Sequence, residues 1–291
     1  MTSEAFPAWV DGRMVAAGEP AIAADDQGLL LGLSVFDTLL YEAGCLYFQE
    51  AHLERLSRGA EQLGIRFGPG RGPAEALGEY LAAFGAEPPD PVLLRLTATR
   101  GRPGGRPTLL VTARRPEALP PGGVTLALAS VPKAATDHTE GIKSTNRLRN
   151  VLAFEEARAR GAWEALFTTT EGELSEGTIS NLFLVFDGPA GPLVKTPALS
   201  QGCLAGTTRE LLLGLLAAKG LAVEDGVLTL DDLARADEGF LTNTSQRVVP
   251  IARVLGTAGQ LFPTRLVSGG PTTRAARQAI AEAEARYAAA R

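Results

Sequence analysis

Residues 140–160 read EGIKSTNRLRNVLAFEEARAR, which puts Lys143 directly after a strand-like run and shortly before a helix. Apolar positions at Val151, Phe154 and Ala157 recur with helical spacing and predict a helix over residues 147–160. A lysine at such a junction can enter a cleft, lose its proton through desolvation or a neighbouring cation, and attack a carbonyl carbon. Taken alone it is more simply a solvated lysine, so the surrounding sequence must decide.

The sequence on either side of this stretch alternates strand and helix patterns, which predicts an α+β fold. Before it, we expect short strands within residues 6–32, a hairpin over 36–48, helices over 49–63 and 73–84, and strands at 92–101 and 108–116. After it, we expect a strand from residue 124, a hairpin over 166–177, a strand over 181–186, and helices over 206–219 and 272–290.

The segment PEALPPGG at residues 116–123 separates these halves, because three prolines and two glycines in eight residues interrupt regular structure. We therefore predict a small N-terminal α/β domain over residues 1–115, an interdomain linker over 116–123 and a larger C-terminal domain over 124–291 that carries Lys143.

Composition excludes several classes of function. The 291 residues are 45% hydrophobic and 21% charged, which predicts a folded globular protein, and the net charge of −5 disfavours nucleic acid and anionic membranes as partners. Two cysteines and two histidines disfavour a disulfide framework, a metal site and most histidine-relay hydrolases. The start, MTSEAFPAWVDGR, lacks a leader pattern, and no run of about 18 apolar residues occurs, so we expect a cytoplasmic protein without a membrane span.

Glu176 lies in ELSEGTISNLFLVF, residues 173–186, between a predicted hairpin and an apolar strand. A carboxylate fixed there can hold a proton on a ring nitrogen, which pyridoxal phosphate needs in order to act as an electron sink. The simpler interpretation is a glutamate that stabilises the turn.

Two further segments have the residues that bind phosphate. CLAGTTRELLLGLL, residues 203–216, places Thr207 and Thr208 at a helix start, where backbone amides and the helix dipole favour an anion. An ordinary threonine cap is the competing interpretation. FLTNTSQRVVP, residues 240–250, repeats this chemistry at Asn243 and Thr244, and Arg55 in EAHLERL is a candidate for the additional cation.

These motifs, taken in order, resemble the class IV aminotransferases, which are the fold-type IV pyridoxal-phosphate enzymes and include branched-chain and D-amino acid aminotransferases and 4-amino-4-deoxychorismate lyase. The resemblance covers nearly the whole chain. It is carried by VDGR, DDQGLLLGLSVFDTLL, FQEAHLERL, IKSTNRLRNVLAFEEARARGA, ELSEGTISNLF, TPALSQGCLAGTTRELLL and FLTNTSQRVVP.

The resemblance implies two α/β domains with pyridoxal 5'-phosphate between them, and a homodimer with active sites near the subunit interface. It further implies that Lys143 is the Schiff-base lysine and general acid/base, that Glu176 is the partner of the pyridinium nitrogen, and that Arg55 binds the phosphate. The same resemblance implies that Arg55 is helped in binding the phosphate by Thr207, Thr208, Asn243 and Thr244.

Among the family's activities, the order Lys143-Ser144-Thr145-Asn146-Arg147-Leu148 is similar to the lysine-x-x-Asn-Arg-Leu pattern of aminodeoxychorismate lyases. Thr38 matches a lyase threonine that assists proton delivery, although a β-branched strand residue is the simpler interpretation. Arg100 and Arg147 can bind substrate carboxylates in a two-point manner, or can be surface salt-bridge residues.

We therefore expect a lyase that acts on a small amino substrate, converting 4-amino-4-deoxychorismate to 4-aminobenzoate and pyruvate in folate biosynthesis. A D-amino acid or branched-chain aminotransferase is the close alternative, and a non-catalytic homologue is a remote one. Residues 31–37, LGLSVFD, depart from the family: leucines replace a common aromatic and aspartate, and Asp37 stands where many relatives have glutamate. The resemblance thus leaves a contact to the cofactor ring oxygen unassigned.

Overall fold

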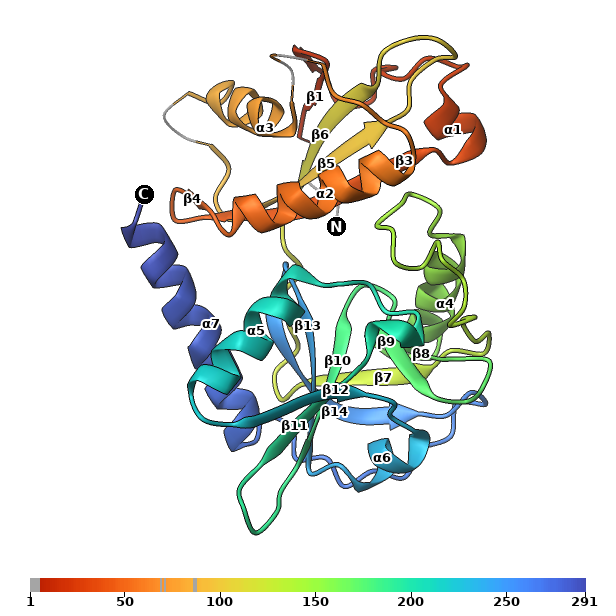
Figure 1. The fold of residues 1–291 in the computed structure, drawn as a ribbon, viewed down its shortest axis with the longest axis vertical. Helices are drawn as coiled ribbons and strands as arrows, with labels where there is room; N and C mark the ends of the chain where they lie inside the picture. Colours follow the sequence, from red (N-terminus) through yellow and green to blue (C-terminus); the bar gives the residue numbers. More distant parts are fainter. Residues whose placement is uncertain (1–5, 69, 71, 86–87) are drawn as a thin grey trace. The chain divides into compact units, whose positions relative to one another are not determined.

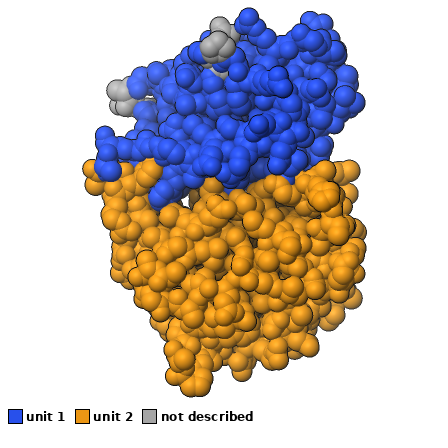
Figure 2. Space-filling model, in the orientation of Figure 1, with its two compact units in different colours: residues 1–117, 142–146, 290–291 blue, residues 118–141, 147–289 orange. Residues whose placement is uncertain are grey.

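A computed structural model describes residues 6–68, 70, 72–85 and 88–291, so the first five residues of the predicted N-terminal domain lie outside the described part. The chain forms two compact units, shown in separate colours in Figure 2. Unit 1 comprises Met1–Glu117, Ile142–Asn146 and Ala290–Arg291, and unit 2 comprises Ala118–Gly141 and Arg147–Ala289. The change from one unit to the other at residues 117–118 falls inside the stretch PEALPPGG.

Unit 1 contains a six-stranded sheet in the order β2-β1-β6-β5-β3-β4 with antiparallel neighbours (Figure 1). Helices α2 and α3 contribute to the same hydrophobic core as β1, β3, β5 and β6, so both helices pack on one face of the sheet. The elements of unit 1 are β1 (Ala8–Val10), β2 (Arg13–Val15), α1 (Gln27–Leu31), β3 (Ser34–Glu42), β4 (Cys45–Leu46), α2 (Gln49–Gln62), α3 (Pro73–Ala82), β5 (Val92–Thr99) and β6 (Thr108–Arg114).

The segment that carries Lys143 belongs to unit 1, whereas the sequence-based boundaries placed it in the C-terminal domain. It lies along β3: the Phe36 amide donates to the Lys143 carbonyl at 2.9 Å, and the Thr145 amide donates to the Ser34 carbonyl at 3.1 Å. These are contacts between residues more than 100 positions apart, which a boundary drawn from local composition does not detect.

Residues Gln27–Leu31 form the short helix α1 rather than part of a strand, so this part of the predicted strand-rich start was wrong. Asp26 caps α1 by accepting a hydrogen bond from the Gly28 amide at 2.7 Å, and Gly32 ends it with a φ of 67°. An acceptor at the N-cap and a left-handed glycine at the C-cap favour a helical turn over extended backbone.

Unit 2 contains an eight-stranded mixed sheet in the order β12-β11-β10-β13-β14-β7-β8-β9. The pairs β11–β12, β7–β14 and β7–β8 are parallel, and the remaining neighbours are antiparallel. Its elements are β7 (Val124–Leu128), α4 (Leu148–Ala159), β8 (Glu164–Thr168), β9 (Leu174–Gly177), β10 (Asn181–Phe186), β11 (Leu193–Pro197), η1 (Leu199–Gln201), α5 (Thr207–Ala218), β12 (Ala222–Gly226), α6 (Leu230–Arg235), β13 (Glu238–Asn243), β14 (Arg247–Leu255) and α7 (Pro271–Ala289).

Helices α5 and α7 pack on one face of the unit 2 sheet, where stacked Phe183 and Phe240 form part of their shared core. Helix α4 packs over β7 and β8 through a separate cluster rich in alanine, whose small side chains permit close approach. Strands and helices in both units confirm the predicted α+β fold class. In the described part of the chain, no helix combines the length and apolar character needed to cross a membrane.

Candidate functional site

Glu176, in β9, is held rigidly in unit 2. Its carboxylate is 3% exposed, and its Oε2 atom accepts hydrogen bonds from Asn181 Nδ2 at 3.1 Å and from the Leu204 amide at 2.9 Å. A buried carboxylate with fixed donors keeps one orientation and avoids the free-energy cost of an unpaired charge. Glu176 therefore has the rigidity that recognition of a ring nitrogen requires.

Asn181 connects Glu176 to both predicted phosphate-binding segments, and sequence reasoning missed it. Its Nδ2 atom also donates to the Leu204 carbonyl at 3.0 Å, and its backbone lies opposite Thr242 in the β10–β13 pair. On the other side, a Cβ atom added to Gly206 would lie only 2.0 Å from Asn181 Oδ1. The end of β9, the start of α5 and the end of β13 therefore meet around one asparagine.

The two predicted phosphate-binding segments both offer polar groups here. Helix α5 begins at Thr207, and the preceding Gly206 supplies no side-chain cap to its first turn. At the end of β13 and in the turn that follows it, buried polar atoms lack a hydrogen-bond partner within the described residues, among them Thr242 Oγ1, Asn243 Nδ2 and Ser245 Oγ. Buried donors without a partner are rare and call for a ligand or water, and a phosphate oxygen fits them. The donor set of unit 2 therefore fits the phosphate of the implied cofactor.

Lys143 and Thr38 share a face of the unit 1 sheet. The Lys143 ammonium lies 5.0 Å from the centroid of the Phe36 ring, and Thr38 follows Phe36 by two positions on β3, so both side chains are on the same side. Arg95 on β5 is paired with Thr38 in the register, and its guanidinium lies 3.5 Å from the centroid of the same Phe36 ring. Sequence reasoning missed Arg95, because only strand pairing shows it beside Thr38.

Arg55, on α2, is buried on the opposite, helix-covered side of β3. Its guanidinium donates to both oxygens of Asp37, from Nε at 2.8 Å and from Nη2 at 2.7 Å. His52 Nδ1 lies 2.8 Å from the same carboxylate. Burial alone would raise the pKa of Asp37, but the charge of Arg55 and the hydrogen bond with His52 outweigh it and hold that pKa well below its usual range.

The two arginines predicted to bind substrate carboxylates lie in different units. Arg147 precedes α4 in unit 2 and donates from Nη2 to the Thr178 carbonyl at 2.8 Å. Arg100 follows β5 in unit 1, is exposed, and lies beside Gly64 after α2. The structure therefore places Arg95, rather than Arg100, with Thr38 and Lys143.

Lys133 is a buried cation that sequence reasoning missed. Its ammonium, with no exposed side-chain area, lies 2.8 Å from Glu176 Oε1, 2.8 Å from Glu140 Oε2 and 2.6 Å from the Gly202 carbonyl oxygen. Burial by itself lowers the pKa of Lys133, but Glu176 and Glu140 outweigh that effect and raise it. Nothing in the surrounding SVPKAATD signals this burial, because the enclosing residues come from distant parts of the chain.

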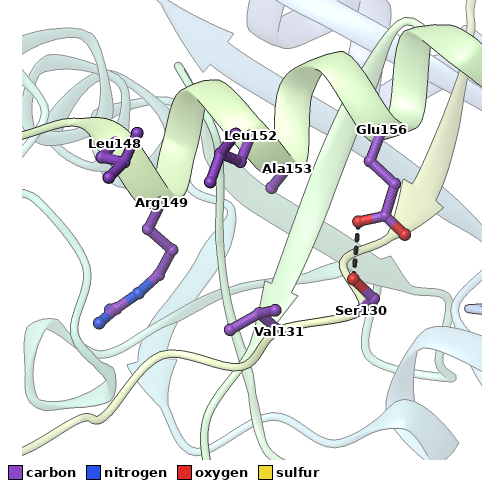
Figure 3. Close-up of a pocket in the computed structure, with 7 residues that line it drawn as sticks. All are labelled: Ser130, Val131, Leu148, Arg149, Leu152, Ala153 and Glu156. Carbon is purple, nitrogen blue, oxygen red and sulfur yellow. Dashed lines mark hydrogen bonds between the residues drawn. The ribbon is translucent and has the colours of Figure 1, made fainter.

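A separate groove of about 330 Å³ opens beside α4 (Figure 3). Its walls are mainly apolar, with a hydrogen bond from Ser130 Oγ to Glu156 Oε2 at 2.7 Å. It is lined by Ser130, Val131, Leu148, Arg149, Leu152, Ala153 and Glu156. None of the predicted site residues lines it.

Comparison with known proteins defines the class. The profile of the amino-transferase class IV family matches residues 34–254, and the chain therefore belongs to that family. A protein of Methanocaldococcus jannaschii, provisionally named a branched-chain-amino-acid aminotransferase, is 30% identical over 85% of this chain and 88% of its own length. The aminodeoxychorismate lyase of Bacillus subtilis is 27% identical over 84% of this chain and 86% of its own. The D-alanine aminotransferase of Bacillus licheniformis is 27% identical over 93% of this chain and 94% of its own length.

Solved structures show the same fold. The T.th. branched-chain amino acid aminotransferase, complexed with N-(5'-phosphopyridoxyl)-L-glutamate, has a TM-score of 0.80 and is 26% identical, with 97% of this chain and 95% of that chain covered. The branched-chain aminotransferase of Thermoproteus uzoniensis, solved with norvaline, also has a TM-score of 0.80 and 26% identity, over 95% and 94%. Two solved branched-chain aminotransferases thus share this architecture.

Proposed function

We propose that this protein is a pyridoxal 5'-phosphate enzyme that cleaves 4-amino-4-deoxychorismate to 4-aminobenzoate and pyruvate. Family membership and a structural relative that holds a phosphopyridoxyl ligand support the cofactor. The buried carboxylate of Glu176 and the unpartnered polar atoms of the β13–β14 turn support it from this chain's own residues. Bound pyridoxal phosphate supplies an electron sink for the electrons released at the substrate α-carbon.

Each polar group of unit 2 has a defined task in this proposal. Glu176 holds a proton at the ring nitrogen of the cofactor, with Asn181 and the Leu204 amide keeping its carboxylate in place. The start of α5, at Thr207 and Thr208, and the turn at Asn243 and Thr244 bind the phosphate. Backbone amides at a helix N-terminus suit an anion because the helix dipole is positive there.

In unit 1, Lys143 is the residue that attaches to the cofactor carbonyl and, once released, takes the α-proton of the substrate. Its ammonium lies 5.0 Å from the centroid of the Phe36 ring, and this cation–π contact holds the side chain on that face of β3. The resemblance assigns Arg55 to the phosphate, with Asp37 orienting its guanidinium through two hydrogen bonds, although this pair lies on the helix-covered face of β3 and Lys143 on the other.

The lyase proposal rests on one observation: Thr38 lies two positions after Phe36 on β3, on the face of the sheet where the Lys143 ammonium approaches the Phe36 ring. Elimination of pyruvate requires a proton for the departing three-carbon fragment, and a hydroxyl on the same face as the lysine can relay it. Arg95, on the same face, has the geometry to bind a substrate carboxylate. Arg147 is a second candidate, with one of its nitrogens already donating to Thr178.

The test is release of 4-aminobenzoate and pyruvate from freshly prepared aminodeoxychorismate by the purified protein loaded with pyridoxal phosphate. We expect equimolar release of both products, and no release by Lys143→Ala. Borohydride reduction followed by peptide mass spectrometry should find the pyridoxyl adduct on Lys143. An adduct on another lysine would overturn the assignment.

Transamination is the second candidate, because four of the five proteins compared above are named aminotransferases. The same residues can return the proton to the cofactor instead of to a departing fragment, so the outcome depends on the substrate. A cofactor-loaded protein that releases neither product but transfers nitrogen from a D-amino acid or branched-chain amino acid to a keto acid would establish this alternative.

We also propose a homodimer, as the family resemblance implies. Light scattering after size exclusion should give twice the chain mass of 30.4 kDa.

A further inference from the structure

Four charged side chains of alternating sign form a continuous row in unit 2. Arg149 Nη1 lies 2.5 Å from Glu140 Oε1, Glu140 Oε2 lies 2.8 Å from Lys133 Nζ, and Lys133 Nζ lies 2.8 Å from Glu176 Oε1. Exposure falls along the row, from 35% at the Arg149 side chain to none at Lys133. The row therefore runs from a partly exposed arginine to the buried carboxylate beside the phosphate-binding segments.

The two oxygens of Glu176 have different partners, and this difference singles out Lys133. Oε2 accepts two hydrogen bonds from neutral donors, the Asn181 amide group and the Leu204 backbone amide. Oε1 accepts a hydrogen bond from the Lys133 ammonium. Lys133 is therefore the cation that forms an ion pair with Glu176 in the described part of the structure. A carboxylate removed from water keeps its charge only where an opposite charge or several donors stabilise it.

We propose that Lys133 is a positioning residue of the cofactor site, which orients the Glu176 carboxylate and sets how strongly it holds a proton on the ring nitrogen of pyridoxal phosphate. This inference rests on the proposed cofactor and assigns a role that neither the motifs nor the comparisons supply. Lys133 acts through Glu176: its three acceptors are the two carboxylates and the Gly202 carbonyl.

The physical reason is that a carboxylate removed from water needs a compensating charge and a fixed orientation. The Lys133 ammonium compensates the charge of Glu176 and holds its Oε1 atom at 2.8 Å, so the carboxylate is fixed where it can pair with a protonated ring nitrogen. Without Lys133, only two neutral donors hold this buried carboxylate, and both its charge compensation and its orientation are weakened.

The test compares Lys133→Met with Lys219→Met, which is a matched control. Lys219 also forms a 2.8 Å ion pair with a glutamate, Glu282, but between the partly exposed surfaces of α5 and α7. For each protein stripped of cofactor, pyridoxal-phosphate affinity is measured by titration, and the absorbance spectrum of the bound cofactor is recorded across pH. Circular dichroism checks folding.

We expect Lys133→Met to weaken cofactor affinity at least tenfold and to change the pH titration of the bound cofactor's absorbance. Lys219→Met should leave the affinity within twofold and the titration unchanged. A folded Lys133→Met protein with the affinity and spectrum of the wild type would overturn the inference. A wild-type protein that binds no pyridoxal phosphate would instead overturn the proposed function.

A second comparison covers the outcome that Lys133→Met fails to fold. The double variant Lys133→Met with Glu176→Gln removes both buried charges together, which avoids leaving either one unpaired. We expect it to bind cofactor within twofold of Glu176→Gln alone, because Lys133 acts through the carboxylate. A further tenfold loss on removing Lys133 from the Glu176→Gln protein would overturn this role.

Discussion

Arg55 and Asp37 form a two-point ion pair inside unit 1, with the Arg55 Nε and Nη2 atoms 2.8 and 2.7 Å from the two carboxylate oxygens. The Asp37 side chain has no exposed area and that of Arg55 has 9%. The pair orients the guanidinium proposed to bind the cofactor phosphate. It also explains how the chain accommodates aspartate where many relatives have glutamate: the shorter side chain still reaches both donor atoms of Arg55.

Removing this carboxylate should destabilise the protein. We expect Asp37→Asn to lower the free energy of unfolding at pH 7 by about 3 kcal/mol, because Arg55 is left buried without its counter-charge. The folded-state pKa of Asp37 is below its unfolded value, so its stabilisation is complete above the unfolded pKa and is lost as pH falls toward the folded one. Urea denaturation across pH should therefore show the two proteins converging in acid. A constant difference between them would contradict this account.

Glu164 should make the free energy of unfolding fall as pH rises, which is opposite to the effect of Asp37. Its buried carboxyl accepts hydrogen bonds from the Ile179 amide at 2.7 Å and from Ser180 Oγ at 2.9 Å, yet burial dominates and raises its pKa to about 7. Between its unfolded pKa and pH 7 the folded state holds the extra proton, so stability decreases as pH rises and levels off above about pH 7. The decrease from this group is on the order of 3 kcal/mol.

The measurement for Glu164 is denaturant unfolding of wild type and Glu164→Gln between pH 4 and 8, a range set by the roughly 4.3 unperturbed pKa of glutamate and the raised value. The difference in stability between the two proteins should shift in favour of the glutamine variant as pH rises. Glu61→Gln, at an exposed position of α2, is the control and should run parallel to the wild type. Parallel curves for Glu164→Gln as well would show that folding does not raise the pKa of this carboxyl.

Gly206 should tolerate no side chain. Alanine would place a Cβ atom 2.0 Å from Asn181 Oδ1, and the displaced asparagine would release its hydrogen bonds to Glu176 and Leu204. We expect Gly206→Ala to weaken pyridoxal-phosphate affinity at least tenfold in a fluorescence titration. Gly214→Ala on the same helix meets no atom within 4 Å, so it should raise stability by about 0.5–1 kcal/mol without changing that affinity. Equal affinities for the two variants would rule out the proposed role of Asn181.

Thr38 should matter for elimination through its hydroxyl group. Thr38→Val keeps the branched shape on β3 but removes the proton relay, and we expect lyase turnover to fall roughly 10²-fold with little change in cofactor affinity. Thr38→Ser keeps the hydroxyl and should retain most of the activity. Steady-state release of 4-aminobenzoate distinguishes the two. If Thr38→Val and Thr38→Ser reduce turnover equally, the function of Thr38 is packing rather than proton transfer.

Much of the secondary structure follows from local pattern. The helix over Gln49–Gln62 and the strand over Asn181–Phe186 match their predicted positions because an apolar face or an unbroken apolar run marks each of them. The sequence analysis missed the short helix at Gln27–Leu31. Its three leucines are exposed, so they do not form the buried apolar face from which a helix is predicted. Its cap, Asp26, is buried and also accepts a hydrogen bond from Thr99 Oγ1 at 2.7 Å, a long-range contact that no local window contains.

The sequence by itself determined the α+β class, the family resemblance and the residue types needed for a phosphate, a ring nitrogen and a carbonyl, because these depend on short motifs. Only the tertiary structure decided which other side chains contact these functional residues. It brought Lys133 to Glu176, across 43 positions, placed Asn181 between Glu176 and Gly206, and set Arg95 next to Thr38. Strand pairing and buried ion pairs bring these residues into contact. Each of these interactions joins residues that are far apart in the sequence, so no local pattern predicts it.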